Sequence, residues 1–242
     1  MNTRILRTVV RLIPNHKLRM VLTGVLVAGA VIFQFYQGWD GKQSAPRDGS
    51  IAPAESGLFS QKFTPVETSG AGLELLSDCR LITGRNSDGD SFHVQHEKGE
   101  TEFRLYFVDT PESKFKTYGG GEDNGERLDQ QAAYFGGLTR DQVTKVGKEG
   151  AVFTKNLLLK DGFKVLTKWE DVVRPGRSYC LVIVEWEGRE VYLHELLVAQ
   201  GLVRVHTRGC DMPQGKGWRE QRKYLENWEK EVKAKGIGAW GL

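Results

Sequence analysis

Two short segments, NSDGDSF at 86–92 and FRLYFVDTPES at 103–113, contain, besides Asp88, four charged side chains that could act together. They are Asp90, Arg104, Asp109 and Glu112. Charges are costly to bury unless they are paired, although they are ordinary on a surface. Aspartate oxygens suit a hard cation such as Ca²⁺ or Mg²⁺, and an arginine fork binds phosphate through two parallel hydrogen bonds. Together the two segments indicate a site for a metal ion and a phosphate.

Each of these residues also has an ordinary interpretation. Asp88-Gly89-Asp90 is typical of a turn, and a single arginine on a strand usually faces solvent. The EF-hand pattern is absent because Phe92 occupies its third ligand position, so any metal would be held by separate strands.

Two further residues complete a possible reaction site. Arg177, in RPGRSYC, precedes a later strand, where a loop could bring it to the same place. Glu112 could take a proton from water while a metal and two arginines hold a phosphate. The combination predicts a phosphodiester hydrolase with a metal, two arginines and one carboxylate base.

The elements that must position these residues follow from periodicity and turn signals. Alternating or apolar runs predict strands at 78–86, 91–97, 101–109, 163–170 and 178–186. KTYGGGEDNGERLDQ is too polar and glycine-rich for a core element and predicts a mobile loop. A helix interposed after the third strand favours a mainly β fold with α, a five-stranded Greek-key barrel of the OB type with about three helices.

Three helices are predicted most clearly. Thr139 and Gln142 form a capping-box pattern that opens a segment to about Lys160, although Gly147 and Gly150 weaken it. LHELLVAQG ends in a glycine, and residues 217–236 carry an apolar stripe. A shorter candidate, RLDQQAAYFG, overlaps the predicted loop.

The N-terminal part predicts a membrane segment. Residues 20–39 are free of charge and long enough to cross a bilayer, and residues 1–19 are basic, which predicts a cytoplasmic N-terminus and a single-pass anchor. A cleaved signal sequence with Ala28-Gly29-Ala30 at its cleavage site is the alternative. Residues 40–75 predict a flexible linker, and residues 76–242 the folded domain.

Composition restricts the function little. The formal net charge of +3 is compatible with an anionic partner but does not require one. Three scattered cysteines form no CxxC pair, which excludes a zinc knuckle and a CxxC redox motif.

The order D-G-D, a strand with an arginine, V-D-T-P-E, G-R and a helix ending in Q-G-L resembles the staphylococcal nuclease (thermonuclease) family over about residues 78–242. The resemblance implies an OB barrel that cleaves DNA and RNA with little sequence preference and leaves 3′-phosphates. It also implies six roles: Ca²⁺ ligands Asp90, Asp109 and the carbonyl of Thr110, general base Glu112, and phosphate clamps Arg104 and Arg177.

The sequence departs from that family in two places. Thr207, Gly209 and Pro175 stand where the family has nucleotide-stacking tyrosines, and the stretch between Glu112 and Phe153 is longer than in short members. We expect a monomeric, membrane-anchored, calcium-dependent nuclease whose domain lies outside the cytoplasm. The alternatives are a secreted form and an inactive OB module that binds nucleic acid or protein.

Overall fold

The computed structural model describes residues 62–85, 87–160 and 162–242. The expected basic terminus at 1–19, the expected membrane segment at 20–39 and most of the expected linker lie outside these residues. Within the described ranges, none of the helices has the length and apolar character that crossing a bilayer requires.

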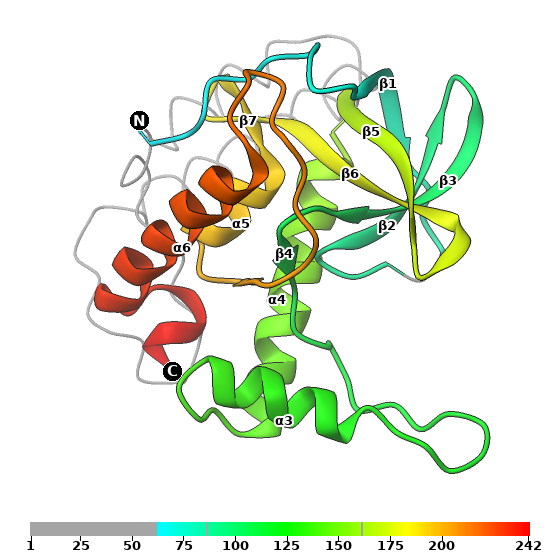
Figure 1. Cartoon of the computed structure of the whole chain (residues 1–242). Coiled ribbons are helices and arrows are strands. Elements are labelled where there is room, and N and C mark those ends of the chain that lie inside the picture. The colour runs from blue at the N-terminus through cyan, green and yellow to red at the C-terminus, as the bar shows by residue number, and fades with distance from the viewer. Residues whose placement is uncertain (1–61, 86, 161) are drawn as a thin grey trace, which may run out of the picture. The chain divides into compact units, whose positions relative to one another are not determined.

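A closed five-stranded barrel forms the body of the domain (Figure 1). Its sheet has the order β3-β2-β1-β5-β6-β7, and parallel pairing of β3 with β6 closes it, while β7 extends β6. The strands are β1 (Glu74–Leu81), β2 (Ser91–His96), β3 (Gly99–Leu105), β5 (Phe163–Val172), β6 (Arg174–Trp186) and β7 (Arg189–Tyr192). This topology confirms the predicted OB-type barrel.

The described residues contain four α-helices and a short 3-10 helix, and the fourth α-helix corresponds to the shorter candidate RLDQQAAYFG. They are α3 (Gly125–Tyr134), α4 (Arg140–Leu158), α5 (Leu193–Ala199), α6 (Trp218–Ala234) and η1 (Gly238–Gly241). The capping box of Thr139 and Gln142 is present at the start of α4. Helix α3 occupies part of the predicted mobile loop because Leu128 is buried against α4 and the C-terminal residues in a second small core.

The predicted third strand, 101–109, is interrupted after Leu105. Phe107 has φ of 72°, and its backbone pairs with Arg208 and His206 rather than continuing β3. Its buried ring stacks on His194 with 5.3 Å between centroids. Residues Val108–Asp109 therefore form a separate strand, β4, which pairs with β8 (Arg204–Val205). This break carries Asp109 away from the barrel wall.

The folded part begins earlier than the predicted residue 76. β1 starts at Glu74, not at 78, and it ends at Leu81 instead of 86. Upstream of it, the ring of Phe63 packs edge-on against Trp228 with centroids 5.2 Å apart. Thr64 donates both its backbone N–H and its hydroxyl to the buried carboxylate of Glu195. The last part of the expected linker is thus part of the domain.

The cysteines contribute apolar surface to the core. Cys79, Cys180 and Cys210 are all buried and free. Burial raises the pKa of the Cys79 and Cys210 thiols to about 12. They are therefore unreactive thiols at neutral pH, and no disulfide supports this domain.

Candidate active site

Closure of the barrel brings the two predicted arginines together. In the parallel register of β3 and β6, Arg104 is opposite Tyr179 and Glu102 is opposite Arg177. Both guanidinium groups donate to the hydroxyl of Ser91, at the start of β2. Arg177 also forms a 3.2 Å ion pair with Glu102. Two cations from strands far apart in sequence thus converge on one point.

Asp109 is the centre of the charge network. Its Oδ1 accepts from Nη2 of Arg104 at 2.6 Å and from Nη2 of Arg127 at 2.7 Å. Its Oδ2 accepts from Nε of Arg204 at 2.8 Å and from Nε2 of Gln131 at 3.1 Å. Burial alone would raise the pKa of Asp109, but the three guanidinium charges outweigh burial and lower it. Asp109 is therefore held as an anion.

Asp90 is equally buried but less well compensated. Its carboxylate accepts from the backbone N–H of Thr110 at 3.0 Å and from the hydroxyl of Ser91 at 3.0 Å. Arg104 forms a 2.9 Å ion pair with it. Burial and the nearby negative charge of Asp88 nevertheless raise the pKa of Asp90 well above its usual range. Arg104 alone therefore does not offset burial and the neighbouring carboxylates.

The turn that carries Asp90 is fixed by close packing. A Cβ on Gly89 would lie 2.6 Å from Oγ1 of Thr110 and 3.0 Å from the backbone of Gly150. Thr154, on α4, donates its hydroxyl to the Gly89 carbonyl over 2.8 Å. The Asp-Gly-Asp turn is thus packed between Thr110, which follows β4, and helix α4, and only glycine fits at its centre.

The donor chemistry around Asp90 and Asp109 fits a hard cation. Oδ1 of Asp88 and Oγ1 of Thr110 are buried oxygen atoms without a hydrogen-bond partner in the part of the chain described. In these ranges no three acidic, histidine or cysteine side chains are grouped to hold a metal ion by themselves. A cation at Asp90 and Asp109 would thus need carbonyl or water oxygens as well, which is ordinary for Ca²⁺. The cation would contact the same two carboxylates that pair with Arg104.

Glu112 lies beside Asp109 and is held by residues that follow it. Its carboxylate accepts from Nε of Arg127 at 3.0 Å, from Nζ of Lys116 at 3.2 Å and from Nδ2 of Asn124 at 3.4 Å. Its backbone N–H donates to Gln131 over 2.9 Å. The segment from Lys116 to α3 is therefore the support of this carboxylate.

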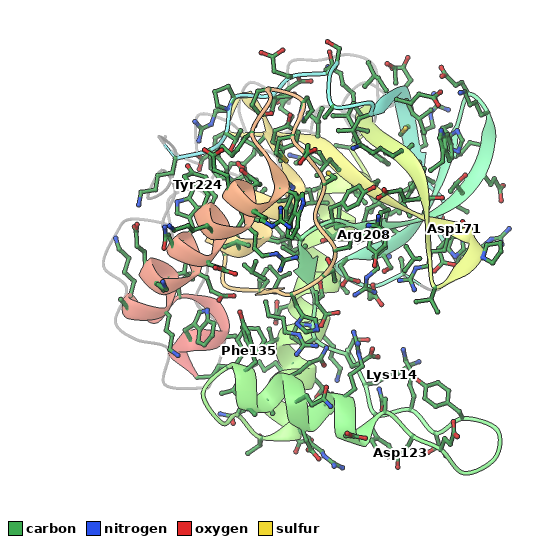
Figure 2. The ribbon with its side chains drawn as sticks, in the orientation of Figure 1. Lys114, Asp123, Phe135, Asp171, Arg208 and Tyr224 are labelled. Carbon is green, nitrogen blue, oxygen red and sulfur yellow. The ribbon has the colours of Figure 1, made fainter. Side chains whose placement is uncertain are left out.

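These side chains open onto one cavity of about 1280 Å³. Arg104, Asp109, Glu112 and Arg177 all line it. Asp90 and Thr110 are instead buried behind this surface. In Figure 2 the space extends between the β5–β6 turn, where Asp171 is labelled, and the segment that carries Lys114. The structure thus brings the six predicted site residues together.

Three residues of the site escaped the sequence analysis: Arg127, Gln131 and Arg204. Two signals could have found them. Arg127 and Gln131 are four residues apart on α3, and such residues share a helix face. Arg204 is a single charge in the apolar run LVRV, and its side chain is 6% exposed. A lone charge in a buried run needs a partner, which here is Asp109.

Two of the positions where the sequence lacks stacking tyrosines, Thr207 and Gly209, have other roles in the structure. A Cβ at Gly209 would lie 2.5 Å from the ring of Phe107, so no side chain fits there. The Thr207 hydroxyl donates to the carbonyls of Leu105 and Val108 at 3.3 and 3.1 Å. Both positions serve the strand break that places Asp109.

The chain was compared with known proteins. A model of the family described as staphylococcal nuclease homologue matches residues 102–241, more than half of the chain. The match includes Arg104, Asp109, Thr110, Glu112 and Arg177, and begins after Asp90. No curated protein matches the chain significantly.

Proposed function

Because the chain belongs to the staphylococcal nuclease family, we propose that it is a calcium-dependent nuclease that hydrolyses phosphodiester bonds of DNA or RNA with little sequence preference. The observation that carries this proposal is the convergence of Arg104 and Arg177 with Asp109 and Glu112 on one cavity. Two guanidinium groups beside two carboxylates suit a bound phosphate and an attacking water.

Each residue has a role in the proposed reaction. Arg104 and Arg177 bind the non-bridging oxygens of the phosphate and stabilise the charge that builds up in the transition state. Glu112 accepts a proton from the attacking water. Arg177 also stabilises the departing 5′-oxygen, which leaves a 3′-phosphate on the product.

Asp90, Asp109 and the carbonyl of Thr110 would hold the calcium ion. When bound, calcium supplies positive charge to the phosphate and the attacking water. Asp109 keeps its charge through three guanidinium groups: Arg127 and Arg104 approach Oδ1, and Arg204 approaches Oδ2 beside Gln131. The buried partners therefore keep a ligand ionised inside the protein.

The location of the protein is proposed from its N-terminal sequence. Charge-free residues 20–39 after basic residues 1–19 support a single-pass anchor with the nuclease domain outside the cytoplasm. A monomer is expected.

The test incubates the purified full chain with single-stranded DNA, duplex DNA and RNA, in Ca²⁺ and in a chelator. We expect calcium-dependent cleavage, with products that a polymerase extends only after phosphatase treatment. Arg177→Ala should lower kcat by about 100- to 1000-fold, the usual effect of removing one transition-state donor. Arg85→Ala is the matched control, because its side chain is 56% exposed in a surface pair with Glu100.

The alternative function has its own signature in this assay. A folded chain that shifts nucleic acid in a gel but cleaves none of it in Ca²⁺ would be a binding module. Cleavage that is equal in Arg177→Ala and wild type would reject the proposed site.

A further inference from the structure

A short arm, residues 114–123, projects beside the site between Glu112 and α3 (Figure 1). Its two sides pair through a bridge between Thr117 and Asp123 and a 2.7 Å hydrogen bond from Tyr118 N–H to the Glu122 carbonyl. Buried Asn124 fixes its base, since its side chain donates to the Lys114 carbonyl. The arm is therefore a hairpin-like element with defined internal bonds.

The arm presents aromatic and basic side chains to the cavity. The side chains of Tyr118 and Phe115 are each 51% exposed, so both rings are accessible to a ligand. Tyr118 lines the cavity together with Lys114 and Lys116, and Phe115 is not among its described lining residues. The opposite wall is the β5–β6 turn, where Val173 is fully exposed.

The cavity is larger than a typical pocket for one small molecule. Small-molecule pockets reach about 1000 Å³, whereas this one measures about 1280 Å³ and continues from the arginines to the arm. A chain of more than one nucleotide fits it. Unpaired bases are commonly bound by stacking on aromatic side chains in a positively charged groove. Tyr118 with Lys114 and Lys116 has this chemistry.

We propose that the arm is a nucleotide-binding subsite for an unpaired strand, an inference that rests on the proposed nuclease function. Tyr118 stacks on a base next to the scissile phosphate, and Lys114 and Lys116 contact the neighbouring phosphates. Bases in a duplex already stack on each other, so the subsite favours single strands. Lys116 also contacts Glu112 over 3.2 Å, so binding on the arm affects the catalytic carboxylate directly.

The test measures binding of the full chain to labelled oligothymidylate and to a labelled blunt duplex by fluorescence anisotropy, in a chelator so that no cleavage occurs. Tyr118→Ala should raise the Kd for oligothymidylate by about 5- to 100-fold, the effect expected for one lost stacking contact. Tyr118→Phe keeps the ring and should bind like wild type. Phe115→Ala, an equally exposed ring on the same arm, is the matched control and should change nothing. Duplex binding should be the same in all variants.

Cleavage assays with the same proteins distinguish a failure of the proposed subsite from a failure of the proposed nuclease function. In Ca²⁺, Tyr118→Ala should raise KM for single strands by a similar factor. Wild-type cleavage with no selective effect of Tyr118→Ala would overturn the subsite and leave the nuclease standing. An equal loss in Phe115→Ala, or on duplex, would also overturn it. A wild-type chain that neither cleaves nor binds would reject both.

Discussion

Asp109 and Arg204 face each other across the two-stranded sheet of β4 and β8, and Nε of Arg204 donates to Oδ2 of Asp109 over 2.8 Å. Both side chains are almost fully buried, at 1% and 6% exposure. The pairing gives the carboxylate a cation on its buried side. Arg104 and Arg127 approach the other oxygen.

Replacing Arg204 should therefore weaken both fold and activity. Removing one partner of a buried ion pair costs about 3–5 kcal/mol when the other is left alone. Here Arg104, Arg127 and Gln131 remain, so Arg204→Met should cost less than that, while kcat falls because Asp109 loses its fixed position. Urea unfolding and single-turnover cleavage measure the two effects. An unchanged kcat would show that the position of Asp109 does not depend on Arg204.

Calcium should stabilise the protein through Asp90 and Asp109. A ligand that binds only the folded state raises its stability in proportion to the logarithm of ligand concentration. We expect thermal unfolding to shift upward with Ca²⁺ in wild type and not in Asp90→Asn. Asp129→Asn changes an exposed pair with Arg140 and should respond like wild type. An equal calcium shift in Asp90→Asn would place the ion elsewhere.

His194 should make stability depend on pH. Burial, and secondly the charge of Lys216, lower its pKa to about 3. The unfolded chain takes up a proton near pH 6.5, whereas the folded chain does not, so stability is full above pH 6.5 and is lost as pH falls toward 3. The loss should be about 1.4 kcal/mol per pH unit below 6.5. His194→Gln should remove this component of the slope in urea titrations between pH 7 and 5. If the free energy of unfolding of wild type and of His194→Gln changed equally with pH, the result would contradict this prediction.

The segment before β1 should be required for stability. A fragment of residues 76–242 lacks Thr64, and of the hydrogen bonds described for the buried Glu195 carboxylate, the 2.7 Å bond from Gln221 then remains. A buried charged group that loses hydrogen bonds costs about 1–3 kcal/mol or more. We expect the fragment to be less stable by at least about 3 kcal/mol than residues 62–242. Thr64→Val in the longer chain removes the hydroxyl alone and should lose a smaller part. Equal urea midpoints for the two fragments would show that Glu195 finds other partners.

The barrel could be predicted because strand periodicity and turn signals are local patterns. Charged motifs suggested five of the six expected site residues, and the family resemblance added Thr110. Alternation identified β2 and β3, and the capping box placed the start of α4. The break at Phe107 could not be predicted, since a positive φ at a phenylalanine in an alternating run contradicts local preference. The contacts with His194 and Arg208 that impose it are distant in sequence.

Gly147 shows how a local rule misled the analysis. By propensity it weakens a helix. In the structure its missing Cβ would lie 2.4 Å from the Pro111 carbonyl oxygen and 2.6 Å from that of Glu112. The glycine thus allows α4 to pass directly beside the backbone that carries Glu112, the proposed general base. Sequence alone gives no distance between these two segments.

The parallel pairing of β3 with β6 has a consequence for the protein during its synthesis. Arg104 and Arg177 belong to the two strands whose pairing closes the barrel, and they are 73 positions apart in the sequence (177 − 104). A nascent chain that has not yet emerged as far as β6 cannot bring these two arginines together, so the proposed phosphate site is incomplete until the barrel closes.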